Sequence, residues 1–168
     1  MAFEYKWSHN EANFGPPTSD QIPGGCHISF EIILKFQGNI VALRRPNAIP
    51  GHELPPSAKD HPEGLLYFCH NLIRYGESIE NFIARTVQEQ AGVAIQGYRI
   101  LTIESDIQQK DQQWAFTPYV IADLELLPSS TSEVTEVIQF RSANIPADFG
   151  WWTKDELLEF LTTHNLVQ

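Results

Sequence analysis

The sequence predicts an α/β (α+β) fold in which a mixed sheet is packed against helices. Three observations support this prediction: an early β-hairpin, an amphipathic helix in the middle of the chain, and a second capped helix near its end. Further apolar segments between the two helices have the length of strands. The order of hairpin, helix, strands and helix favours a mixed α/β sandwich.

The hairpin is predicted from alternating apolar and polar residues. Five apolar side chains occupy every second position and therefore share one face of a strand: Ile28, Phe30, Ile32, Leu34 and Phe36. Gln37-Gly38-Asn39 follows as a turn, because Gly and Asn tolerate a positive φ angle. Residues 40–43 are apolar again, so the chain is expected to return as the second strand.

The central helix is predicted to begin after Ser78, a good N-cap residue, and to stop at Gly92. Its apolar residues have helical spacing. The last helix is expected to begin at Thr153, which forms a capping-box pattern with Glu156. Strands are expected at residues 65–68, 98–104, 114–126 and 134–140, the third of them bent or interrupted at Pro118.

The remaining segments are an N-terminal arm and a long loop. Residues 1–25 are polar and aromatic and are predicted to pack through a few rings, leaving residues 26–168 as a single domain. Residues 46–64 contain five of the 11 prolines and show little periodicity, which predicts a loop.

Composition narrows the possible functions. The chain has 168 residues, 42% of them hydrophobic, which suits one globular domain. The net charge of −10 argues against duplex nucleic acid as the main partner, because phosphate binding requires clustered Lys and Arg. No apolar run is long enough to span a bilayer, and the first residues lack a signal-peptide core. With two cysteines, a reduced cytoplasmic location is expected.

Residues 71–93 read NLIRYGESIENFIARTVQEQAGV and resemble the Nudix box. The matching positions are Glu77, Arg85, Val87, Glu89, Gly92 and Val93. The flanks agree, because Leu43-Arg44-Arg45-Pro46 ends a hairpin before the box, and Trp151 precedes Asp155-Glu156-Leu157 at the last helix. The resemblance extends over roughly residues 26–163. It implies a Nudix-like α/β/α sandwich with a mixed sheet.

The resemblance also implies a function. Members of the family are hydrolases of nucleoside diphosphate-linked or related pyrophosphate substrates, and they use Mg²⁺ or Mn²⁺. The catalytic positions it implies are Glu77, Arg85, Glu89 and Gln90, with Glu89 as a metal ligand. Arg44, Arg45 and Arg74 are candidates for holding the phosphates of a nucleotide or sugar-nucleotide ligand.

The sequence departs from the box where the metal would bind. Cys69-His70-Asn71 stands where the family has Pro-Gly-Gly, and Thr86 and Gln90 replace two glutamates. Positions 86, 89 and 90 share one helix face, so that face carries a charge of about −1 where three carboxylates would give about −3. Hard dications prefer several carboxylate ligands. The segment retains much of the box's framework and lacks most of its metal-binding charge.

Two interpretations follow. In the first, the protein is a Nudix hydrolase that takes replacement ligands from outside the standard positions, the candidates being His70, Glu104, Asp106, Glu133 and Glu136. In the second, it is a catalytically silent module that binds a ligand or a protein partner, with no metal. A homodimer is compatible with either interpretation.

Each candidate also has a structural interpretation. Glu77 and Arg85 are equally explained as a pair that fixes the start of the helix, and Glu89 as a solvated helix acid. Cys69 and His70 are expected on opposite sides of a strand, which argues against a thiol and base pair. The loop residues that resemble metal ligands have no zinc spacing: His52, Glu53, Asp60, His61 and Glu63. Trp151 and Trp152 are expected to divide between surface and core, one of them available to stack on a base.

Overall fold

The computed structural model describes residues 25–47, 54–109 and 112–166. Its strands and helices, in chain order, are β1 (Cys26–Phe36), β2 (Asn39–Arg45), a 3₁₀ turn (Pro56–Asp60), β3 (Leu65–Tyr67), β4 (Cys69–Leu72), α3 (Ile79–Ala91), β5 (Ile95–Ile107), β6 (Trp114–Leu124), β7 (Glu136–Phe140), a second 3₁₀ turn (Ser142–Asn144) and α4 (Lys154–Thr163). The predicted N-terminal arm lies outside the described residues except for Gly25, as do the loop residues His52 and Glu53.

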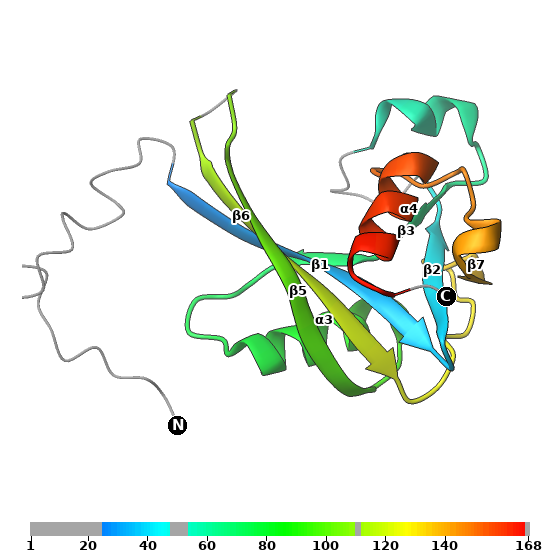
Figure 1. Ribbon diagram of the computed structural model, residues 1–168, viewed down its shortest axis with the longest axis horizontal. Coiled ribbons are helices and arrows are strands. Elements are labelled where there is room, and N and C mark those ends of the chain that lie inside the picture. Colours follow the sequence, from blue (N-terminus) through cyan, green and yellow to red (C-terminus); the bar gives the residue numbers. More distant parts are fainter. Residues whose placement is uncertain (1–24, 48–53, 110–111, 167–168) are drawn as a thin grey trace, which may run out of the picture.

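The strands form one mixed sheet with β1 near its centre. Its main path is β3-β2-β1-β6-β5, with β4 also pairing with β1 and β7 with β2. The β1–β6 pair is parallel, and the other pairs are antiparallel. The predicted mixed sheet is therefore confirmed, and the long strands β1, β5 and β6 run together across the molecule (Figure 1).

The two α-helices cover opposite faces of the sheet. Phe30, Ile32 and Leu34 of β1 point into a core cluster that includes Phe82 and Val87 of α3. The alternate positions point the other way, so Ile33 joins a second cluster with Leu157 and Leu161 of α4. Figure 1 shows β1 passing between α3 and α4. The predicted sandwich is confirmed by these two cores.

The local signals that end the elements act as the sequence predicts. Gln37 and Gly38 both have positive φ angles, 48° and 81°, and they close the β1–β2 hairpin. The Ser78 hydroxyl accepts a hydrogen bond from the Asn81 backbone, and Gly92 ends α3 in the left-handed conformation. Thr153 and Glu156 form the predicted capping box of α4.

The predicted interruption of the third strand is wrong, because β6 continues through Pro118 to Leu124. Pro118 has no amide hydrogen, and the β1–β6 register skips this position, running from Ile28–Phe116 to Glu31–Tyr119. The irregularity lies instead in β5, whose register with β6 shifts between Ile100 and Thr102. Proline has thus interrupted the hydrogen-bond ladder on one side and left the strand intact.

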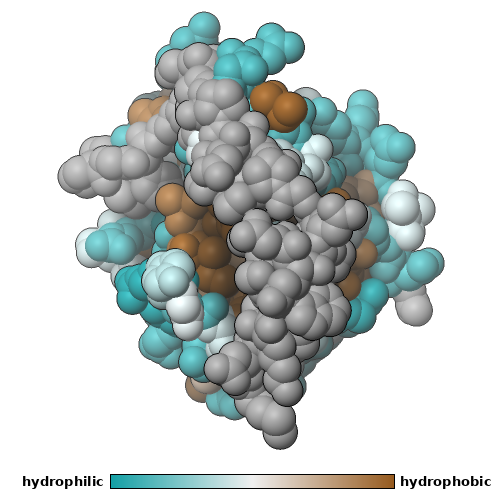
Figure 2. Space-filling model, turned by 90° about the vertical axis from the view of Figure 1, so that its left-hand side faces the viewer, coloured by the Kyte–Doolittle hydropathy of each residue, from teal (hydrophilic) through white to brown (hydrophobic). Residues whose placement is uncertain are grey.

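The hairpin of β5 and β6 projects beyond the helices, at the upper left of Figure 1. Several of its large apolar side chains are exposed, among them Ile103 and Ile107 of β5. Figure 2, which views the molecule from that side, shows apolar surface among polar side chains. Among the described residues, no helix combines the length and apolarity needed to cross a membrane.

Candidate functional site

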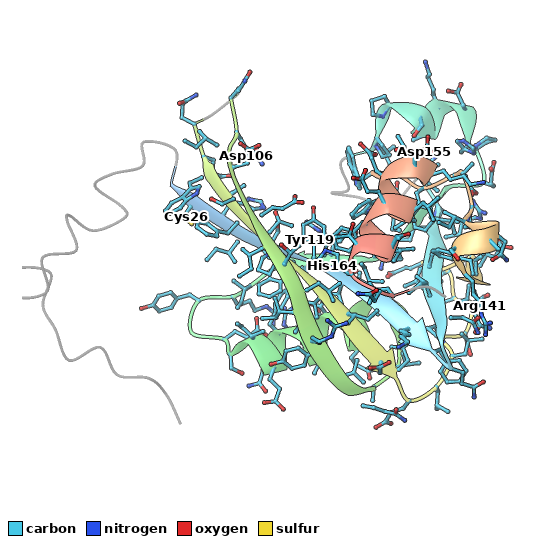
Figure 3. The ribbon with its side chains drawn as sticks, viewed as in Figure 1. Cys26, Asp106, Tyr119, Arg141, Asp155 and His164 are labelled. Atoms are coloured by element: carbon cyan, nitrogen blue, oxygen red, sulfur yellow. The ribbon has the colours of Figure 1, made fainter. Side chains whose placement is uncertain are left out.

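A cleft of about 900 Å³ lies between the sheet and α4. Three aromatic side chains in its lining form a contact cluster: the rings of Tyr119 and Phe160 are 5.1 Å apart, Trp152 and Phe160 5.2 Å, and Tyr119 and Trp152 5.9 Å, measured between centroids. Tyr67, Phe68 and Trp151 also line the cleft. Figure 3 labels Tyr119 and His164 where β6 passes α4. The cleft therefore offers several flat apolar surfaces.

Strand alternation and a helix cap place these rings. Tyr119 neighbours Val120, which points to α3, so Tyr119 points to the α4 side with Ile121. Trp152 comes directly before Thr153, the N-cap of α4, and packs against the second core cluster. Trp151 is 56% exposed, which confirms the expected division of the two tryptophans between surface and core.

Arg45, Gln90 and His70 are joined at the cleft where α3 meets the ends of β2 and β4. Arg45 is only 7% exposed, and its Nη2 donates to the Gln90 side-chain oxygen at 3.1 Å. The same oxygen accepts the backbone N–H of His70 at 3.1 Å, and the Gln90 amide donates to the His70 carbonyl at 2.7 Å. Both ends of the Gln90 amide are therefore engaged by the protein.

The two glutamates that match the Nudix box, Glu77 just before α3 and Glu89 within it, are held by arginines. Arg85 donates to both carboxylate oxygens of Glu77 at 2.7 and 2.8 Å, and these bonds hold the pKa of Glu77 near 2. Arg85 also donates to Glu89 at 2.9 Å, and Arg74 reaches the second Glu89 oxygen at 3.4 Å. Glu89 thus has an arginine donor on each oxygen.

The side-chain oxygens on this face of α3 are poorly suited to bind a divalent cation. Glu89 is shared by two arginines, and the amide oxygen of Gln90 accepts from a third. Thr86 is fully buried, and its hydroxyl has no hydrogen-bond partner among the described residues. Mg²⁺ and Mn²⁺ favour carboxylate oxygens, and a nearby guanidinium repels them. In the described part of the chain, no three His, Cys, Asp or Glu side chains are grouped to hold a metal.

The remaining predicted residues are dispersed. Arg44 lies outside the cleft lining and is bound by Glu136 at 2.7 Å and Asp148 at 2.6 Å, whereas Arg74 is largely exposed. Of the possible replacement ligands, His70 and Glu104 line the cleft and Asp106, Glu133 and Glu136 do not. Cys69 is buried on the side of β4 opposite His70, and burial raises the pKa of its thiol to about 12.

Four carboxylates line the same cleft: Glu31, Glu104, Glu156 and Glu159. Glu31 bonds to the His70 ring at 3.0 Å and accepts from the Trp152 indole at 3.4 Å. Glu104 accepts the Tyr119 hydroxyl at 2.9 Å, and burial together with this contact raises the pKa of Tyr119. The sequence predicts Glu104 as a possible metal ligand and Glu156 as part of a helix cap, and it does not mark Glu31 or Glu159 as site residues. The cleft residues come from distant segments, so no local pattern marks them.

Comparison with known structures agrees with this architecture. No family profile and no curated protein sequence matches the chain. A MutT Nudix hydrolase from Burkholderia pseudomallei superposes with a TM-score of 0.57 at 15% identity, covering 80% of this chain and 96% of the other. The Bacillus subtilis pyrophosphohydrolase BsRppH superposes with a TM-score of 0.57 at 16% identity, covering 90% and 85%. The chain therefore has the fold of the Nudix hydrolases.

Proposed function

We propose that this protein binds a small, ring-containing molecule in the cleft between the sheet and α4, without metal-dependent phosphoanhydride cleavage on α3. The observation that carries the proposal is the contact between Arg45 and Gln90. The resemblance to the Nudix box assigns position 90 to a carboxylate that faces a metal cation. Here an amide stands at that position, and the protein's own guanidinium is bound to it.

The cleft itself has the features of a ligand site. Its volume of about 900 Å³ lies within the range of small-molecule pockets. Tyr119, Trp152 and Phe160 line it as half-buried rings in mutual contact, and a planar ring can pack favourably against such a cluster. A nucleoside, or another compound with a planar heterocyclic ring, is the class of molecule that we propose, since such a ring can pack against this cluster.

Hydrolysis of a nucleoside diphosphate-linked substrate with Mg²⁺ or Mn²⁺ is the competing hypothesis. It requires Glu89 to leave Arg85 and Arg74, and Arg45 to leave Gln90, before a dication can be held. The roles predicted for Glu77, Arg85, Glu89 and Gln90 in catalysis, and for the arginines in phosphate binding, belong to this hypothesis. Dimerisation and a cytoplasmic location are predictions under either hypothesis.

The test is a panel of nucleosides, nucleotides, nucleotide sugars and nicotinamide-type heterocycles, examined by thermal shift and calorimetry in EDTA and again in Mn²⁺, with product release measured in parallel. We expect at least one compound to bind in EDTA and none to be cleaved. Trp151→Ala should weaken that binding, because Trp151 lines the cleft and is exposed enough to be removed without unfolding. Tyr75→Ala is the control, since Tyr75 is fully exposed outside the cleft.

Two outcomes would overturn the proposal. The first is Mn²⁺-dependent cleavage that Glu89→Gln abolishes, which would establish the hydrolase. The second is a panel in which no compound binds with or without the metal.

A further inference from the structure

We infer that the ligand of this cleft is a planar cation that carries a hydrogen-bond acceptor, such as an N-alkylated pyridinium or purine ring, and that polyphosphates are disfavoured. The inference rests on the proposed function, because it names the class of molecule that the same cleft binds. It follows from three properties of the lining: its charge, its aromatic faces and one buried donor.

The charge of the lining is negative. Among the described lining residues there are four carboxylates and one arginine, and the two histidines, His70 and His164, are the other titratable bases. The carboxylates come from three elements, Glu31 from β1, Glu104 from β5, and Glu156 and Glu159 from α4. A negative lining contributed by three elements favours a positive ligand over a polyphosphate.

The aromatic cluster favours the same sign of charge. A cation over the face of a Trp or Tyr ring is attracted by the ring's quadrupole. Tyr119 and Trp152 lie in the cleft lining, and each is also hydrogen bonded to one of the carboxylates, Glu104 and Glu31 respectively. Because those acids hold the two rings in place, aromatic and ionic attraction act on a ligand at the same position.

Arg45 adds a requirement for an acceptor. Its side chain lines the cleft and is 7% exposed, yet its Nε has no hydrogen-bond partner among the described residues. A buried donor without a partner is costly, so a ligand oxygen that came within hydrogen-bond distance would be favoured, and because Nε itself is covered this requires a small shift of the Arg45 side chain. Arg45 already donates to Gln90, and a single partly occupied guanidinium suits one carbonyl oxygen better than a chain of phosphates.

The experiment uses a matched pair of probes on the full chain. 1-Methylnicotinamide is a permanent planar cation with a carboxamide acceptor, and nicotinamide is its neutral counterpart. Both, together with ADP in EDTA, are titrated by tryptophan fluorescence and calorimetry. We expect 1-methylnicotinamide to bind at least about tenfold more tightly than nicotinamide and than ADP, and its affinity to fall as salt is raised.

The variants separate the cleft charge from the net charge of the protein. Glu159→Gln should weaken binding of 1-methylnicotinamide about threefold and leave nicotinamide unchanged, because Glu159 is exposed and lines the cleft. Glu125→Gln, an equally exposed acid outside the cleft, should change neither.

The failures of the inference and of the proposed function are distinguishable. Equal binding of the charged and neutral probes, or tightest binding of ADP, would overturn the inference and leave the cleft a ligand site. Absence of binding by these probes would also overturn the inference. If the nucleotide panel then bound nothing as well, the proposed function would fall with it.

Discussion

Gln90→Ala is expected to destabilise the protein, because Gln90 joins α3 to both Arg45 and His70. The substitution removes the side-chain oxygen that accepts a hydrogen bond from Arg45. Arg45 is only 7% exposed, so its guanidinium cannot turn to water instead. The substitution also removes two hydrogen bonds that join α3 to His70. The guanidinium would keep the long contact of 3.4 Å to the backbone carbonyl of residue 90.

The magnitude follows from these three bonds. A hydrogen bond from a charged donor contributes about 1.5–3 kcal/mol, and the two bonds to His70, which lie nearer solvent, contribute about 0.5–1 kcal/mol each. We therefore expect a loss of about 3 kcal/mol in the free energy of unfolding. For a chain of this size that corresponds to a fall of about 6–12 °C in Tm.

A double-mutant cycle measured by urea unfolding isolates the contact itself. Arg45→Met removes the buried charge while filling most of the same volume, so the cost of Gln90→Ala should be smaller when Met stands at position 45. We expect a coupling energy of about 2 kcal/mol between the two positions. Gln88→Ala is the matched control, since Gln88 is exposed on the same helix and should change stability by less than about 0.5 kcal/mol.

A coupling energy below about 0.5 kcal/mol would refute the reasoning. It would mean that Arg45 and Gln90 do not hold each other in solution, and that Gln90 is free to face a ligand or a cation.

Three further predictions follow from other buried or paired groups. Thr86→Val should raise the free energy of unfolding by about 1 kcal/mol in urea titrations, because it replaces with a methyl group a buried hydroxyl that has no hydrogen-bond partner in the part of the chain that the structure describes. Native protein should react with a thiol reagent at Cys26, which is exposed, and not at Cys69, whose thiol is buried and has a pKa raised to about 12. Mass spectrometry of the labelled peptides would check this, and rapid labelling of Cys69 would contradict it. Glu77→Gln should destabilise the protein above pH 4.5, because the pKa of Glu77 is lowered from 4.5 to about 2 by its bonds to Arg85. The difference in the free energy of unfolding between wild type and variant should shrink as the pH falls from 4.5 towards 2. A series of unfolding measurements in which this difference stays constant with pH would count against the Glu77–Arg85 pair.

Much of the fold could be predicted because its signals are local. The alternation in β1, the left-handed glycine at position 92 and the capping box at Thr153 each depend on residues a few positions apart. The prediction failed at Pro118 because the effect of a missing amide hydrogen depends on which neighbouring strand needs it, and that is a property of the assembled sheet.

The candidate site was predicted in part. Arg45, His70 and Glu104 were candidates from the sequence and line the cleft, whereas Glu77, just before α3, and Arg85, in its middle, are paired with each other outside the lining. The contact between Arg45 and Gln90 joins positions 45 residues apart, and that between Glu31 and Trp152 joins positions 121 apart. Neither has a sequence pattern, so the charge and aromatic lining of the cleft emerge only from the tertiary structure.

The most direct test of the account is a titration with Mn²⁺ followed by electron paramagnetic resonance, on wild-type protein and on Glu89→Gln. The account predicts that wild type shows no saturable Mn²⁺ site that depends on Glu89, because three arginines already engage the oxygens of Glu89 and Gln90. Stoichiometric, tight binding of Mn²⁺ that disappears in Glu89→Gln would contradict it.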